Sequence, residues 1–143
     1  MDKTPRQTKR HCALIVGHSN ARPGATNLSG GISEFQFNSR LAKSIVESVP
    51  AYSDTRISIV FRKIYRALPA EVNSLTPDFC ISLHCNAFDT TASGTQTLYY
   101  HNSAESKALA ERVQQVAVDS LNLRDRGVVA VRGNGRGAHL LRN

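Results

Sequence analysis

The chain has 143 residues, 41% of them hydrophobic and 20% charged, which is typical of one soluble globular domain with a core. Its net charge of +7 comes from the ends, because residues 1–10 hold four Lys/Arg, residues 124–143 hold five, and the stretch between them is neutral. Nucleic-acid-binding proteins carry basic residues on the folded body, so this distribution disfavours nucleic acid as a partner.

No apolar stretch has the length of a membrane span, so membrane insertion is not expected. The basic N-terminus is not followed by the apolar segment of a secretory signal. We therefore expect a protein that stays in the cytoplasm, leaves the cell by an unusual route, or has already lost a leader. Residues 1–11 are expected to form a flexible basic tail.

The three cysteines are an odd number without metal-ligand spacing, which favours reduced thiols and no disulfide framework. Cys12 and Cys80 lie in apolar runs and are expected in the core. Cys85 is interpreted as a small residue packed beside a site; a nucleophilic role is the less favoured alternative.

The first expected strand is the apolar run 13–16, which leads through Gly17 into His18. Residues 19–33 are dense in turn formers and predict a loop. Ser33 and Gln36 have the capping-box spacing, and the apolar stripe that follows predicts a helix that stops at Pro50.

Residues 57–61 alternate like a strand, and Pro69 marks the first turn of a short helix that ends before Pro77. A second buried strand, 79–83, leads into His84, and a Thr- and Tyr-rich strand is expected over 95–101. An amphipathic helix is expected from about 102 to 121, and a glycine-containing loop over 122–143. This order predicts a single α/β domain over 1–143, with a mostly parallel central sheet and helices on both faces.

Two histidines therefore end two buried parallel strands. Ligands of such sheets bind outside the carboxyl ends of the strands, so His18 and His84 are expected at one edge. Glu34, in the first turn of the first helix, offers a third ligand. Two His and one Glu form a ligand set of catalytic zinc, which keeps one position open for water. His101 and His139 are secondary candidates, and His11 is expected at the surface.

Each of these residues also has a structural interpretation. A single histidine in such a place is more often a hydrogen-bonded core or loop residue than a ligand. Acidic residues are common in first helical turns, where the helix dipole stabilises them. The separations of 16 and 50 residues between the three candidates match no metal motif. Two histidines at equivalent sheet positions are the feature that favours a metal site.

Four segments carry a resemblance to a known family: Val16–His18, Ser33–Phe35, Pro77–Phe88 and Ala92–Thr95. They resemble the zinc-dependent N-acetylmuramoyl-L-alanine amidases of the bacterial cell wall, in which a Gly-His, a Glu opening the first helix, a Ser-Ile-His-x-Asn block and a Ser-Gly occur in this order. The resemblance extends over residues 12–142. Its most specific part is the block around His84.

The resemblance implies that His18, Glu34 and His84 hold zinc and that Asn86 lines the cleft. It also implies that the substrate is peptidoglycan, cleaved at the amide between N-acetylmuramic acid and L-alanine. The protein would then act on the cell wall, in the periplasm or outside the cell, after cytoplasmic synthesis and release of the phage type or after removal of a leader. Peptide stems carry free carboxylates, so Arg132 and Arg136 are candidate substrate contacts by charge, although solubility explains them equally well.

One departure from the family affects the expected activity. The family carries a catalytic glutamate beyond the position of Arg142, whereas this sequence has no Asp or Glu after Asp125. No catalytic base is therefore identified. The chain is interpreted as a truncated amidase that lacks the terminal strand and helix, binds zinc and hydrolyses poorly.

Two alternative functions remain open at this stage. One is a non-catalytic, zinc-containing module that binds or regulates the cell wall, which the missing glutamate favours. The other is an unrelated zinc peptidase with a similar α/β sandwich, which would cleave simple peptides rather than intact peptidoglycan.

Overall fold

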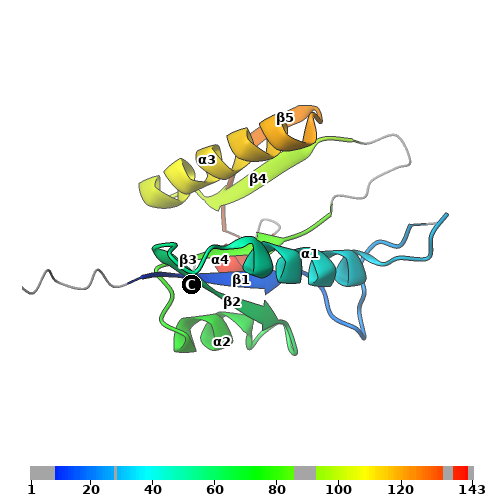
Figure 1. The fold of residues 1–143 in the computed structure, drawn as a ribbon, viewed down its shortest axis with the longest axis horizontal. Coiled ribbons are helices and arrows are strands. Elements are labelled where there is room, and N and C mark those ends of the chain that lie inside the picture. Colours follow the sequence, from blue (N-terminus) through cyan, green and yellow to red (C-terminus); the bar gives the residue numbers. More distant parts are fainter. Residues whose placement is uncertain (1–8, 28, 86–92, 134–136, 142–143) are drawn as a thin grey trace, which may run out of the picture. The chain divides into compact units, whose positions relative to one another are not determined.

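The computed structural model describes residues 9–27, 29–85, 93–133 and 137–141 (Figure 1). They belong to two compact units, Met1–Asn86 and Ala87–Asn143, and each is described by itself. No helix in these ranges is both long and apolar enough to cross a bilayer.

The first unit is a three-stranded parallel sheet with two helices. Its strand order is β2-β1-β3, and β1 pairs in parallel with both neighbours. In chain order the elements are β1 (Arg10–Val16), α1 (Glu34–Ser48), β2 (Thr55–Phe61), α2 (Leu68–Ser74) and β3 (Phe79–Leu83). α1 and α2 lie on opposite sides of β1 and β2 (Figure 1). The predicted α/β class with a parallel sheet is confirmed.

The core of this unit is built on both faces of the central strand. Cys12, Leu14 and Val16 pack toward α1, where they meet Ala42. The alternate residues Ala13 and Ile15 face the opposite side and are equally buried. A strand that is covered on both faces needs apolar residues at successive positions rather than apolar and polar residues in alternation. β1 has this continuous apolar pattern.

The start of α1 is fixed by a local interaction that the sequence predicts. Ser33 Oγ accepts a hydrogen bond from the Gln36 N–H at 3.3 Å, and Gln36 Oε1 accepts one from the Ser33 N–H at 3.0 Å. This capping box makes Glu34 the first helical residue, and its side chain is 3% exposed. The cap therefore sets the position of a candidate ligand.

His11 is not a surface residue, as the sequence suggested, but is 3% exposed. β1 begins at Arg10, so the last two residues of the expected tail are part of a strand. His11 Nε2 lies 2.8 Å from Ser58 Oγ, and its backbone N–H donates to Asp78 Oδ2 at 2.6 Å. The pairing of β1 with two neighbours extends the strand beyond its apolar run. Residues 1–8 lie outside the described ranges.

The three thiols are free, and the two in the sheet are shielded. Burial, with a smaller contribution from Cys80, raises the pKa of Cys12 from 9.0 to about 11, and burial raises the pKa of Cys80. In the β1–β3 register Cys12 is opposite Phe79, so neighbouring Cys80 points to the other face. This arrangement explains why the two thiols form no disulfide.

We expect Cys12 and Cys80 to react with a thiol reagent at pH 7.5 much more slowly in the native than in the unfolded protein, because the thiolate is the nucleophile. Both pKa values are raised, so stability should be retained below pH 9 and should fall as the pH rises above 9, where the unfolded thiols ionise first; for Cys12 this fall extends to about pH 11. Alkylation kinetics followed by mass spectrometry and denaturant unfolding at several pH values measure the two effects. A single free thiol in unreduced protein would contradict the assignment.

The second unit is a parallel pair of strands with a long helix. It comprises β4 (Thr95–Tyr100), α3 (Ala104–Leu121), β5 (Asp125–Val131) and the short α4 (Ala138–Leu141). The loop expected over 122–143 is therefore wrong, since β5 and α4 make up half of it. Glycine and arginine mask the strand pattern of β5, in which four of the seven residues are exposed.

A buried glutamine joins the helix of this unit to both strands. Gln114 is 4% exposed, and its Nε2 donates to the Thr95 carbonyl at 3.0 Å and to Asp125 Oδ1 at 2.5 Å. Its Oε1 accepts from Thr97 Oγ1 at 2.9 Å. Hydrogen bonds from the Gly127 N–H and from Gln114 lower the pKa of Asp125. A polar residue in the helix thus fixes how α3 lies on β4 and β5.

Candidate metal centre

The first unit brings three candidate ligands to one edge of its sheet. His18 follows β1, His84 follows the adjacent β3, and Glu34 is the first residue of α1. His18 Nε2 lies 3.2 Å from Glu34 Oε2, and His84 Nδ1 lies 3.1 Å from Glu34 Oε1. One donor atom from each residue lies within 4.8 Å of the other two. The three residues predicted as ligands are therefore neighbours in space.

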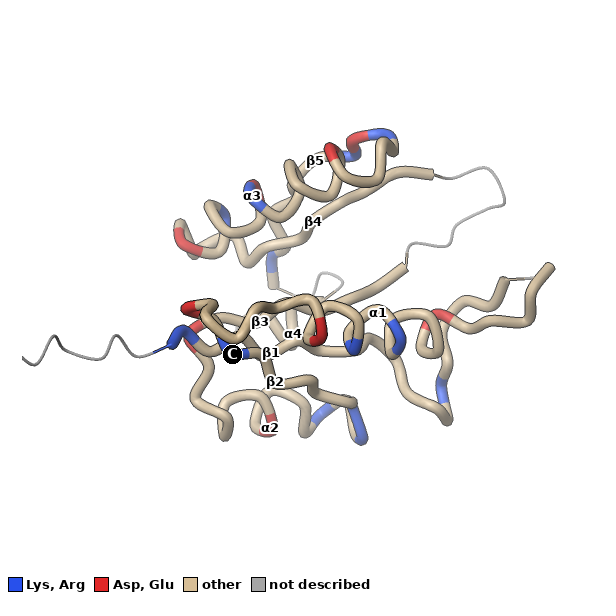
Figure 2. Tube along the Cα trace, viewed as in Figure 1, with Lys and Arg blue, Asp and Glu red and all other residues tan. Residues whose placement is uncertain are grey.

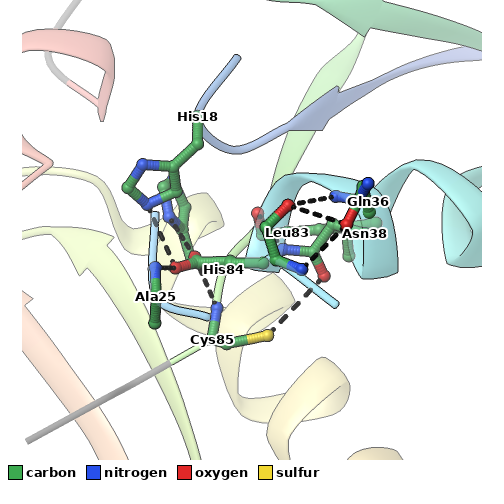
Figure 3. A network of polar contacts seen from close by, with 9 residues as sticks. His18, Ala25, Gln36, Asn38, Leu83, His84 and Cys85 are labelled. Carbon is green, nitrogen blue, oxygen red and sulfur yellow. Dashed lines mark hydrogen bonds and ion pairs between the residues drawn. The ribbon is translucent and has the colours of Figure 1, made fainter. Parts of the chain in front are cut away.

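The carboxylate of this group is buried, and the two rings are open to solvent. The Glu34 side chain is 3% exposed, compared with 26% for His18 and 46% for His84. The two rings are edge-on, with centroids 5.1 Å apart (Figure 3). A ligand approaching from solvent meets the imidazoles first, with the negative charge behind them.

Two backbone N–H groups hold the carboxylate in place. The Cys85 N–H donates to Glu34 Oε1 at 2.7 Å, and the Ala25 N–H lies 3.4 Å from Oε2. The N-terminal position of Glu34 on α1 adds the favourable helix dipole. These contacts keep one carboxylate oxygen beside each histidine ring.

Two glycines leave the space that this arrangement needs. A Cβ atom on Gly17 would lie 2.4 Å from the Leu83 carbonyl oxygen and 2.6 Å from the His84 ring. On Gly24, where φ is +78°, it would lie 2.7 Å from Glu34 Oε2 and 2.8 Å from the His18 ring. Neither position accommodates a larger residue without moving a candidate ligand.

The segment between β1 and α1 folds back over the site. His18 itself has a φ of 67°, an uncommon conformation for a residue other than glycine. The Glu34 N–H donates to the Ala25 carbonyl at 2.7 Å, and the Phe35 N–H donates to the Pro23 carbonyl at 3.0 Å. The loop that the sequence predicts is thus attached to the start of α1 and places Gly24 against the ligands.

The donor set fits a zinc ion. One donor atom from each of the three residues lies within 4.8 Å of the other two, close enough for a single ion to bind all three. Two imidazole nitrogens and one carboxylate oxygen are common zinc donors, and three protein ligands leave a position for substrate.

Sequence reasoning missed a buried asparagine that supports the site. Asn38 is 2% exposed, and its Nδ2 donates to the Leu83 carbonyl at 3.2 Å. Its Oδ1 accepts from Cys85 Sγ at 4.0 Å (Figure 3). Asn38 thus holds the residues on both sides of His84 against α1. The available signal was its spacing, because a residue four positions after Glu34 lies on the same helix face.

Cys85 is a neighbour of the ligands rather than a reactive group. Burial and the Glu34 carboxylate raise the pKa of its thiol, and the hydrogen bond with Asn38 lowers it by a smaller amount. A thiol with a raised pKa is a poor nucleophile at neutral pH. The predicted packing role agrees with this environment.

We expect Asn38→Leu to weaken metal binding about 10- to 100-fold, the usual effect of losing a hydrogen bond that supports a ligand. The residues flanking His84 would lose their connection to α1. Competition with a chromophoric chelator measures the affinity, and far-UV circular dichroism verifies the fold. Ser39→Ala is the matched control, because Ser39 donates to the Phe35 carbonyl of its own helix and, among the described residues, has no hydrogen bond to the segment around His84. An unchanged affinity in folded Asn38→Leu would contradict the role.

The other predicted site residues are either outside the described residues or part of the second unit. Asn86 and Arg136 fall outside the described residues. Arg132 follows β5 and is exposed, and His101 and His139 also belong to the second unit. None of these three belongs to the metal-ligand group of the first unit.

Comparison with known proteins shows to which family this sequence belongs. The model of the family described as N-acetylmuramoyl-L-alanine amidase matches residues 12–142. The chain belongs to this amidase family. It is a family of peptidoglycan amidases whose members generally depend on a metal, so the alternative of an unrelated zinc peptidase loses its basis.

Two relatives in the amidase family are much longer than this chain. N-acetylmuramoyl-L-alanine amidase LytC of Bacillus subtilis is 30% identical over 118 residues, which cover 78% of this chain and 23% of LytC. An uncharacterized cell wall amidase of Bacillus anthracis is 37% identical over 59 residues, or 36% of this chain and 11% of that protein. The chain therefore matches about a quarter of LytC and a smaller part of the second relative.

Solved structures agree on the amidase fold. An N-acetylmuramoyl-L-alanine amidase from Clostridium difficile 630 superposes with a TM-score of 0.83 at 23% identity, covering 94% of this chain and 74% of that one. The catalytic domain of the CD27L endolysin, which targets Clostridia difficile, gives a TM-score of 0.72 at 21% identity. This match covers 85% of this chain and 71% of the endolysin domain.

Proposed function

We propose that the protein is a zinc-dependent peptidoglycan hydrolase that cleaves the amide between N-acetylmuramic acid and L-alanine, and that it acts on the cell wall. The observation that carries the proposal is the convergence of His18, Glu34 and His84 at one sheet edge, in a chain of the amidase family. Hydrolysis needs no redox chemistry, which favours zinc over iron for a site with two histidines and one carboxylate.

The roles of the residues follow from their surroundings. A bound zinc ion would supply Lewis acidity that polarises the scissile carbonyl and acidifies water. His18 and His84 would present neutral nitrogen donors at the open side of the site, and buried Glu34 would supply the negative charge. The N–H groups of Cys85 and Ala25 keep that carboxylate oriented.

The test is a product analysis on purified cell walls. Protein stripped of metal and then loaded with one equivalent of zinc is incubated with dye-labelled peptidoglycan, and new amino termini are labelled and identified. Release of stem peptides that begin with alanine supports the proposal. Zinc-loaded protein that binds walls but releases no alanine amino termini would refute it and favour the non-catalytic wall-binding module. New reducing sugar ends would indicate a different bond.

A further inference from the structure

A basic turn follows β2 in the same unit as the candidate ligands. This basic turn, residues 62–66, contains Arg62, Lys63 and Arg66 within five positions. Lys63 and Arg66 are exposed and Arg62 is half-buried. No ion pair between described residues involves any of the three. The turn therefore presents three positive charges that the described part of the chain does not neutralise.

The turn lies at the sheet edge that carries the metal centre. β2 is the direct parallel neighbour of β1, and Phe61 is paired with Val16. The segments that follow these two strands therefore leave the sheet at the same level. The Phe61 ring packs edge-on against Phe35, the residue after Glu34, with centroids 6.3 Å apart. Figure 2 shows the blue segments between β2 and α2 at the end of the sheet toward which the β1 and β2 arrows point in Figure 1.

The conformation of the turn is fixed before any ligand arrives. The Ala67 N–H donates to the Ile64 carbonyl at 3.1 Å, and buried Leu68 anchors the helix that follows. The Arg62 guanidinium carbon lies 5.5 Å from the centre of the Tyr65 ring, within the range of a cation–π contact. An ordered cation loses less entropy on binding than a free one.

The turn also exposes apolar surface between its charges. Ile64 is 66% exposed and Tyr65 is 47% exposed. A ligand that combines negative groups with aliphatic side chains complements this surface better than a bare polyphosphate does. A planar guanidinium such as that of Arg62 suits a carboxylate in particular, because it can donate two parallel hydrogen bonds.

We propose that the basic turn binds free carboxylates of the peptide stem, and so sets on which side of the scissile amide the peptide lies. This role rests on the proposed function. Charge alone had suggested Arg132 and Arg136 for it, but Arg132 belongs to the second unit and Arg136 lies outside the described residues. The basic turn belongs to the unit that contains the candidate ligands.

The experiment measures binding rather than cleavage, so it does not depend on the enzyme being active. The probe is the synthetic tetrapeptide L-Ala-γ-D-Glu-L-Lys-D-Ala, which lacks the muramyl amide, compared with its analogue in which both carboxylates are carboxamides. Binding to the full chain is followed by NMR titration at low ionic strength. The variant is R62Q/K63Q/R66Q. The control R40Q/K43Q/R56Q removes the same charge from exposed cations of the same unit.

We expect the tetrapeptide to bind the turn variant about tenfold more weakly than the wild type, since exposed ion pairs each contribute little and three act together. The control should bind within about twofold of the wild type. The carboxamide analogue should bind the wild type as weakly as the acid binds the turn variant, and the variant should no longer distinguish the two peptides.

Three results would overturn the proposal. Equal affinity of the turn variant and the wild type is the first, and an equal loss in the control, which would indicate only net charge, is the second. The third is loss of binding to a glycerol phosphate polymer with unchanged tetrapeptide binding, because the turn would then serve a phosphate ligand. Circular dichroism of each variant excludes unfolding as the cause of a loss.

Discussion

Replacing His84 with alanine is expected to reduce bound zinc from about one ion per chain to nearly none, and to abolish amide cleavage with it. His84 supplies one of three candidate donors, and its Nδ1 lies 3.1 Å from the Glu34 carboxylate. Losing a hydrogen bond that supports a ligand weakens metal binding about 10- to 100-fold, so losing the ligand itself should exceed that range. Elemental analysis after gel filtration in the presence of a weak chelator measures the stoichiometry.

His101→Ala is the matched control for this experiment. Its ring packs against Tyr100 in the second unit, outside the candidate ligand group, so zinc content should stay unchanged. Added zinc should raise the melting temperature of the wild type and of the control but not that of His84→Ala, because binding to the native state stabilises it. Unchanged zinc content in folded His84→Ala would remove His84 from the site.

The sequence could predict the elements whose pattern is local. The unalternating apolar run of β1 and the Ser33–Gln36 capping box each depend on residues close together in the chain, and the structure contains both features. Because parallel strands end at one edge, the positions of His18 and His84 after two such runs were enough to predict that they meet. This convergence follows from topology and needs no knowledge of distances.

The rest depends on partners that are distant in sequence. His11 is buried because β1 pairs on both sides and Ser58 lies beside its ring, which no property of residues 10–13 reveals. β5 is mostly exposed and contains Gly127, so its composition resembles a loop, and its pairing with β4 is what makes it a strand. In the same way, the role of Asn38 follows from its contact with Leu83, 45 positions away.

The packing of backbone against the ligands is the least predictable feature, because it depends on a close approach in which an added Cβ atom would lie less than 3 Å from ligand atoms. Gly24 was one turn-forming residue among many in the segment 19–33. In the structure it lies against both His18 and Glu34, at a φ of +78°. This contact means that the segment helps to shape the site, and a single methyl group tests it.

Gly24→Ala is therefore expected to weaken zinc binding by about 100-fold or more while the chain stays folded. Losing a hydrogen bond that supports a ligand weakens metal binding about 10- to 100-fold, so the expected effect equals or exceeds the upper end of that range. The added Cβ would lie 2.7 Å from Glu34 Oε2 and 2.8 Å from the His18 ring, so one ligand must move. Catalytic sites held by only three protein ligands depend on all of them. Chelator competition measures the affinity, and denaturant unfolding measures the stability.

Gly31→Ala separates the two effects of the added methyl group. Gly31 has a similar φ of +63°, but nothing lies within 4 Å of the place that a Cβ atom would occupy there. Both variants should lose about 1 kcal/mol of stability, because alanine is strained at positive φ. Only Gly24→Ala should also lose zinc affinity, since only there does the methyl group meet ligand atoms. Equal zinc affinity in the two variants would mean that the ligands have room to adjust, and that Gly24 is required only by the backbone turn.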